Sequence, residues 1–128
     1  KQELLQIMEN PDVFWQDFLS LQNEIHERLK LYTGCIIYGA GVVGKRIYDG
    51  MYEGDKAKVR GFCVTNAKEN AESYKGCKIR EIEEYTAFRE EAAIIVGVSV
   101  KYRMEIVKIL NEKRFAHSII LNSAGANI

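Results

Sequence analysis

Short apolar runs alternate along this chain with segments in which apolar residues recur every three or four positions. The runs at 35–38 and 92–98 are almost entirely apolar, which is typical of parallel strands covered on both faces. Weaker runs at 58–64, 76–79 and 117–121 predict three more strands. Because helical segments lie between the runs, we expect one parallel sheet with right-handed crossovers.

The segments between the runs predict the covering helices. One amphipathic helix follows the first run and closes at Gly54–Asp55, and two more are expected at 81–90 and 101–113, whereas 65–75 is expected to be a polar loop. The predicted fold class is α/β with a doubly wound parallel sheet. Its strands, numbered along the chain, lie in the order 3-2-1-4-5, so the first strand is central.

Upstream of the sheet, one long helix is expected over residues 10–32, starting with a capping asparagine, a proline and an acid. One apolar stripe follows this helix, formed by Phe14, Phe18, Leu21, Ile25 and Leu29 and widened by Trp15 and Leu19. Such a stripe needs a cover, which the sheet, a second copy in a homodimer or missing domains of a parent chain could provide. We therefore divide the chain into an N-terminal helical extension, residues 1–32, and the domain that carries the sheet, residues 33–128.

The charge balance narrows the class of partner. Eighteen basic and eighteen acidic residues among 128 give a net charge of zero, so no broad attraction to nucleic acid is expected. No apolar stretch reaches the ~20 residues of a membrane helix, and no signal peptide opens the chain. Three cysteines without metal-ligand spacing favour packing roles, no metal site and a reducing, cytoplasmic setting. The chain begins within a helical pattern and without methionine, so we expect a fragment of a longer protein.

The first buried run leads into the turn Gly39-Ala40-Gly41-Val42-Val43-Gly44. This is G-x-G-x-x-G between a strand and a helix, the context in which the motif binds nucleotide phosphates. Gly39 would allow a tight turn, Gly41 the close approach of a phosphate, and Gly44 close packing of helix on strand. Amides at the helix start would point at the ligand, and the helix dipole favours its negative charge. The alternative is a turn that has lost its ligand.

The end of the second predicted strand does not fit a conventional NAD site. An Asp or Glu usually stands there and holds the ribose hydroxyls, but this chain has Thr65-Asn66. Both side chains can hydrogen-bond a hydroxyl, so we keep Thr65 and Asn66 as candidate binding residues. The expected ligand is a nucleotide or nucleotide-sugar, with NAD(P) as the alternative cofactor.

Further candidates are few. Ser99 follows the fourth predicted strand at its carboxyl end, where open α/β sheets bind ligands, so it either contacts a ligand or caps the next helix. Tyr102 lies one turn further and shares both interpretations. His26 and His117 have no acid or nucleophile placed beside them, so we expect structural or surface roles for both. No catalytic residue is assigned.

A succession of motifs resembles a known family. IYGAGVVG at 37–44, RGFCV at 60–64, GCKI at 76–79 and IIVGV at 94–98 occur in this order, and the resemblance covers roughly residues 32–121. The chain resembles the small Rossmann-like domain of bacterial surface-polysaccharide biosynthesis proteins, which accompanies glycosyltransferases and methyltransferases and forms the N-terminal domain of sugar acyltransferases. The resemblance implies a nucleotide-sugar held at the glycine turn, with chemistry performed by another part of the protein. It also implies an acidic end of strand two, which this chain lacks.

Three functions stay open at this point. The first is a nucleotide or nucleotide-sugar binding module of a larger bacterial glycosyltransferase or other polysaccharide-biosynthesis protein. The second is the NAD(P)-binding domain of an oxidoreductase. The third is an interaction domain with a vestigial phosphate loop, whose contact surface is formed by Phe14, Trp15 and Phe18.

Overall fold

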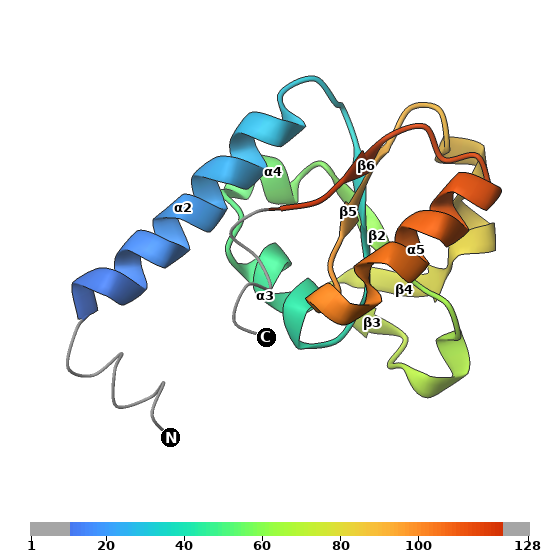
Figure 1. The fold of residues 1–128 in the computed structure, drawn as a ribbon, viewed down its shortest axis with the longest axis horizontal. Helices are drawn as coiled ribbons and strands as arrows, with labels where there is room; N and C mark the ends of the chain where they lie inside the picture. Colours follow the sequence, from blue (N-terminus) through green and yellow to red (C-terminus); the bar gives the residue numbers. More distant parts are fainter. Residues whose placement is uncertain (1–10, 122–128) are drawn as a thin grey trace.

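The computed structural model describes the backbone of residues 11–121 and the side chains in that range other than those of 11–17 and 69. Its helices are α2 (Pro11–Leu29), α3 (Val42–Asp49), α4 (Glu53–Lys56) and α5 (Val100–Glu112), with two 3₁₀ helices, η1 (Ala67–Glu69) and η2 (Ile82–Phe88). Its strands are β1 (Cys35–Tyr38), β2 (Val59–Val64), β3 (Ser73–Tyr74), β4 (Cys77–Glu81), β5 (Ala93–Val96) and β6 (Ser118–Ile119). Figure 1 shows these elements around one sheet.

The strands form a single sheet in the order β3-β4-β2-β1-β5-β6. All neighbouring strands pair in parallel except β3 and β4. β1 lies between β2 and β5, with Tyr38 beside Cys63 on one side and beside Val96 on the other. Every residue of β1 and β5 is buried. The expected α/β fold with two buried parallel strands inside its sheet is confirmed.

One predicted loop contains regular structure. Residues 65–75 include η1 and the short strand β3, so the prediction of a polar loop is wrong there. β3 and β4 form a hairpin whose two-residue turn is Lys75-Gly76, with positive φ at both residues, 48° and 85°. That backbone is the one that primed turns require, because it follows the twist of the two strands. Lysine is not typical of such a turn, so the turn residues did not predict this hairpin.

The helix after the glycine turn is shorter than predicted. It ends at Asp49 rather than at Gly54–Asp55, and α4 is a separate helical turn. The amide of Met51 still bonds the Tyr48 carbonyl at 3.1 Å. The chain then leaves the helix because Tyr52 adopts extended backbone (ψ 154°) as the N-cap of α4.

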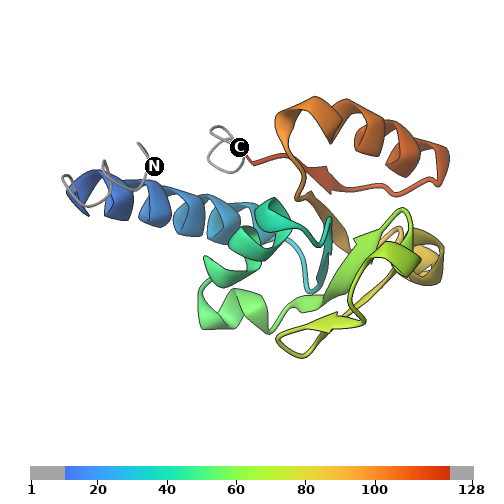
Figure 2. The same ribbon diagram turned by 90° about the horizontal axis from the view of Figure 1, so that it is seen from below.

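Helices cover both faces of the sheet. On one face, Ile37 of β1 packs in a cluster with Ile25 of α2 and Ile47 of α3. On the other face, the preceding residue Ile36 packs in a cluster with Leu110 of α5. Figures 1 and 2 show the same division, with α2, α3 and α4 on one side of the sheet and α5 on the other. The alternation of faces along β1 therefore builds two cores from one strand.

The stripe on α2 joins the first of these cores. Leu21, Ile25 and Leu29 are buried against the sheet, and Phe18 is half-buried. The predicted cover of the stripe is therefore confirmed at its last three positions. The side chains of Phe14-Trp15, and with them most of the predicted contact surface, lie outside the described residues. The segment expected as an extension thus shares the core of the sheet, while its start projects past the sheet in both views (Figures 1 and 2).

Polar contacts also hold α2 in place. The Nδ1 atom of His26 lies 3.0 Å from Oδ2 of Asp55, a carboxylate that is almost completely buried. The ammonium of Lys58 donates to the Leu29 carbonyl at 2.9 Å, close to the end of the helix. His26 therefore does have an acid beside it, contrary to the sequence analysis, because Asp55 reaches it from 29 residues further along the chain. The pair lies away from the carboxyl edge of the sheet, and its role is to dock α2.

Replacing Ile25 with alanine tests whether α2 belongs to the folded unit. Ile25 is fully buried, and removing a buried isoleucine side chain costs about 2–5 kcal/mol. Leu19→Ala on the same helix is the matched control, since Leu19 is 47% exposed. Urea denaturation should show the free energy of unfolding reduced by roughly that amount for Ile25→Ala, and by less than about 1 kcal/mol for Leu19→Ala. If Ile25→Ala reduces the free energy of unfolding by no more than Leu19→Ala does, α2 folds independently of the sheet.

Candidate functional site

Three glycines bring the backbone of β1, α3 and β5 into direct contact. Gly39 has a φ of 113°, and a Cβ placed on it would overlap the Gly97 carbonyl. A Cβ on Gly44 would overlap the Gly39 carbonyl, and one on Gly97 would lie 3.1 Å from the Gly44 Cα. The predicted roles of Gly39 in a tight turn and of Gly44 in helix packing fit this geometry. Gly97, just after β5, is a third partner, and the sequence pattern did not indicate its packing role.

Gly41 differs from these three glycines. It is the N-cap of α3 with a φ of −92°, and no described atom lies within 4 Å of the position that its Cβ would take. Neither backbone strain nor packing within the described chain therefore explains a glycine here. The open space above Gly41 is where a ligand's phosphate would come close to the backbone.

The first turn of α3 supplies hydrogen-bond donors beside this space. The first helical bond runs from the Lys45 amide to the Gly41 carbonyl at 3.1 Å. The amides of Val42, Val43 and Gly44 precede it, so they have no acceptor within the helix. Together with the dipole of α3, they form a partial positive charge at the turn.

A second helix begins beside the first. β5 is the neighbour of β1, and Ser99 is the N-cap of α5. Ser99 makes no side-chain cap bond and is half-buried, so its hydroxyl is not committed to capping. Tyr102, one turn into α5, is 48% exposed. Figure 1 shows α3 and α5 starting at the same edge of the sheet, on opposite faces. This is the point where crossovers change direction, the place where open α/β sheets bind ligands.

The end of β2 lies next to the glycine turn. The Gly39 amide donates to the Cys63 carbonyl at 2.8 Å, and Thr65 and Asn66 follow two and three residues after Cys63. The Thr65 hydroxyl lies 2.7 Å from the Tyr38 hydroxyl, and Oδ1 of Asn66 accepts from the Lys68 amide at 3.0 Å. The structure therefore brings Thr65 and Asn66 to the same edge as the glycine turn, but both side chains already have partners there.

Two exposed apolar side chains flank this edge. Val42 opens α3 and is 74% exposed, and Val100 opens α5 and is 53% exposed. Val42 lies in the turn that carries the free amides of α3, and Val100 follows Ser99. Apolar side chains beside a few directed polar groups are the usual lining of small-molecule sites.

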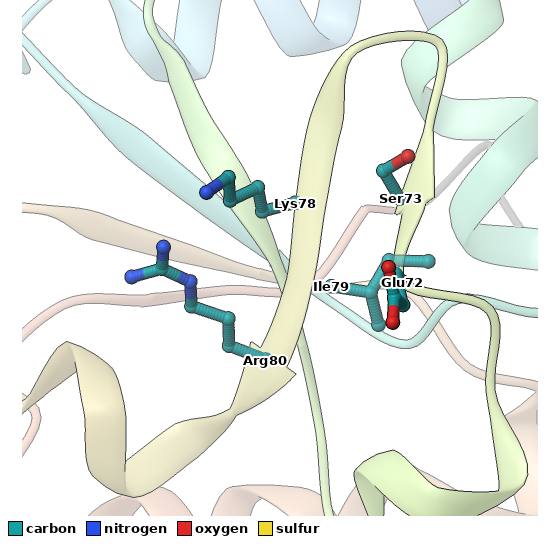
Figure 3. A pocket seen from close by; sticks show the side chains of 5 residues that line it. All are labelled: Glu72, Ser73, Lys78, Ile79 and Arg80. Carbon is teal, nitrogen blue, oxygen red and sulfur yellow. The ribbon is translucent and has the colours of Figure 1, made fainter.

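A surface hollow of about 310 Å³ lies elsewhere, along the edge strand β3 and its neighbour β4. Figure 3 shows Lys78 and Arg80 on one side of β4, with Glu72, Ser73 and Ile79 on the other. All of these except Ile79 are exposed. Because the lining side chains diverge around the strand, they do not converge on one ligand, and we assign the hollow no role.

The cysteines do not supply a nucleophile to the site. Burial raises the pKa of Cys35 to about 12, and burial also raises the pKa of Cys63 well above its usual value. Cys77 is partly exposed and lies on the β3–β4 hairpin, two strands away from β1. Within residues 11–121, no three His, Cys, Asp or Glu side chains gather as a metal site requires. In the same range, no helix has the length and hydropathy to cross a bilayer.

No family model, curated protein or solved structure matches this chain. The site is therefore interpreted from its own geometry.

Replacing Gly44 and Gly41 with alanine, one at a time, tests which of the two glycines the packing of the fold requires. Gly44→Ala forces a methyl group against the Gly39 backbone and should reduce the free energy of unfolding by about 3 kcal/mol. Gly41→Ala meets no described atom and should cost less than about 1 kcal/mol, the scale of an N-cap change. Chemical denaturation of both variants measures the difference. A destabilised Gly41→Ala protein would show that this position, too, is occupied by the fold.

Proposed function

We propose that this chain is a nucleotide- or nucleotide-sugar-binding module, with the ligand's phosphates resting on the turn from Ala40 to Val43. The open position at Gly41 carries the proposal, because neither a positive φ nor packing against the described residues requires a glycine there. The free amides of the first turn of α3 would donate to the phosphate oxygens, and the helix dipole would favour their charge.

The rest of the ligand would extend along the carboxyl edge of the sheet. The base or sugar would run toward Thr65, Asn66 and Ser99, whose positions border the turn. The exposed side chains of Val42 and Val100 offer it apolar surface. A dinucleotide such as NAD(P) is the second candidate ligand, because the turn lies where the crossovers reverse direction, the usual place for dinucleotides.

Binding rather than catalysis is the role that this edge supports. Burial raises the pKa of the Tyr38 phenol, so Tyr38 stays protonated near neutrality and does not serve as a base there. Its partner is a threonine hydroxyl, which is no stronger a base. By its resemblance to polysaccharide-biosynthesis proteins, we place the module in a larger cytoplasmic bacterial transferase, with the glycosyl transfer performed by another domain.

Gly41→Val tests the phosphate site. The valine side chain would occupy the space proposed for the phosphate, and calorimetric titration should show at least a tenfold loss of affinity for nucleotides that the parent binds. Gly54→Val is the matched control, because Gly54 also has open space around it but lies on α4. Its affinity should equal that of the parent.

The ligand class follows from a thermal-shift panel of NAD, NADP, UDP-sugars, GDP-sugars and coenzyme A. A ligand at a hundred times its Kd stabilises the native state by about 2.7 kcal/mol, which raises the melting temperature measurably. A shift with UDP-sugars or GDP-sugars supports the proposal, and one with NAD or NADP alone supports the second candidate. If none of them stabilises the parent, the glycine turn is vestigial and the proposal fails.

A further inference from the structure

The end of β2 lacks an acid, but β4, its neighbour in the sheet, places one beside it. Glu81 is the last residue of β4, and it lies beside Val64, the last residue of β2, in the parallel register. Its carboxylate extends toward the loop that follows β2, where Oε2 accepts from the Ala67 amide at 3.3 Å. A half-buried carboxylate therefore stands next to Thr65 and Asn66, although the chain places it 15 residues or more away.

The capping of η2 also holds the Glu81 carboxylate in place. Glu81 is the N-cap of η2, and its side chain accepts from the backbone amide of Glu84, while the Glu84 side chain accepts from the Glu81 amide at 3.2 Å. A carboxylate has about four acceptor positions, and these two amides use only part of them. The carboxylate is thus held in place and keeps capacity for further donors.

We infer that Glu81 receives the ribose hydroxyls of the bound nucleotide. This inference rests on the proposed function. The neighbouring Thr65 and Asn66 side chains are uncharged and each makes a hydrogen bond within the protein, so neither replaces the missing acid. A carboxylate at this edge accepts from a cis-diol and repels a phosphate at the 2′ position. The ligand class is therefore a ribonucleotide with a free 2′ hydroxyl, and 2′-phosphorylated cofactors such as NADP are disfavoured.

The test compares Glu81→Gln with Glu84→Gln, which removes the same charge from the other half of the same cap. Calorimetric titrations use ADP and UDP, their 2′-deoxy analogues, and ADP with a 2′-phosphate. The parent should bind ribonucleotides at least fivefold more tightly than the deoxy forms, and the 2′-phosphate form more weakly still. Glu81→Gln should reduce the ribo/deoxy ratio toward one and improve relative binding of the 2′-phosphate form. Glu84→Gln should leave both ratios unchanged.

Each other outcome decides against the inference. Equal parent affinity for ribo and deoxy forms would overturn it, and so would equal changes in both variants, because these would show an effect of the cap on the loop. Binding that Gly41→Val abolishes and Glu81→Gln leaves unaltered would keep the proposed function and remove only the role of Glu81. If the parent binds no nucleotide, both fall together.

Discussion

The backbone contact among Gly39, Gly44 and Gly97 is the constraint on which the candidate site depends. Side chains at these positions would hold α3 away from β1 and β5, because each Cβ would fall on or against a neighbouring backbone atom. With glycine at all three, α3 starts directly at the end of β1. Its free amides then open at the carboxyl edge of the two central strands, beside the start of α5. The close packing of the three glycines thus determines where the free amides of α3, with their partial positive charge, lie.

A glycine in the turn can serve the packing of the fold or the approach of a ligand, and the backbone contact shows which glycines serve packing. Packing accounts for Gly39 and Gly44, so their presence would be expected even in a turn with no ligand. At Gly41 neither a positive φ nor packing against the described residues requires glycine, although glycine is also favoured at a helix N-cap. The motif as a whole is therefore weak evidence of binding, whereas its middle glycine is stronger evidence.

Local signals made the central part of the fold predictable. The apolar runs of β1 and β5 and the glycine turn between strand and helix are readable within a few residues, and the structure has them at the expected positions. Features that depend on distant pairing were not readable. The contact of His26 with Asp55 requires the docking of α2, and the place of Glu81 requires the register between β2 and β4. Periodicity carries no information about either.

In the proposed site, recognition of a nucleotide would divide between backbone and side chains. Backbone amides of α3 would bind any phosphate, so they give affinity without telling one nucleotide from another. The side chains at the end of β2 carry no charge, and each already makes one hydrogen bond within the protein, Thr65 with the Tyr38 hydroxyl and Asn66 with the Lys68 amide. In the proposed site, selectivity would come from groups on neighbouring strands and helices, where Glu81 has free acceptor capacity and Val100 has exposed apolar surface. If Glu81 receives the ribose as proposed, the discrimination that an acid at the end of β2 would provide lies on β4 instead.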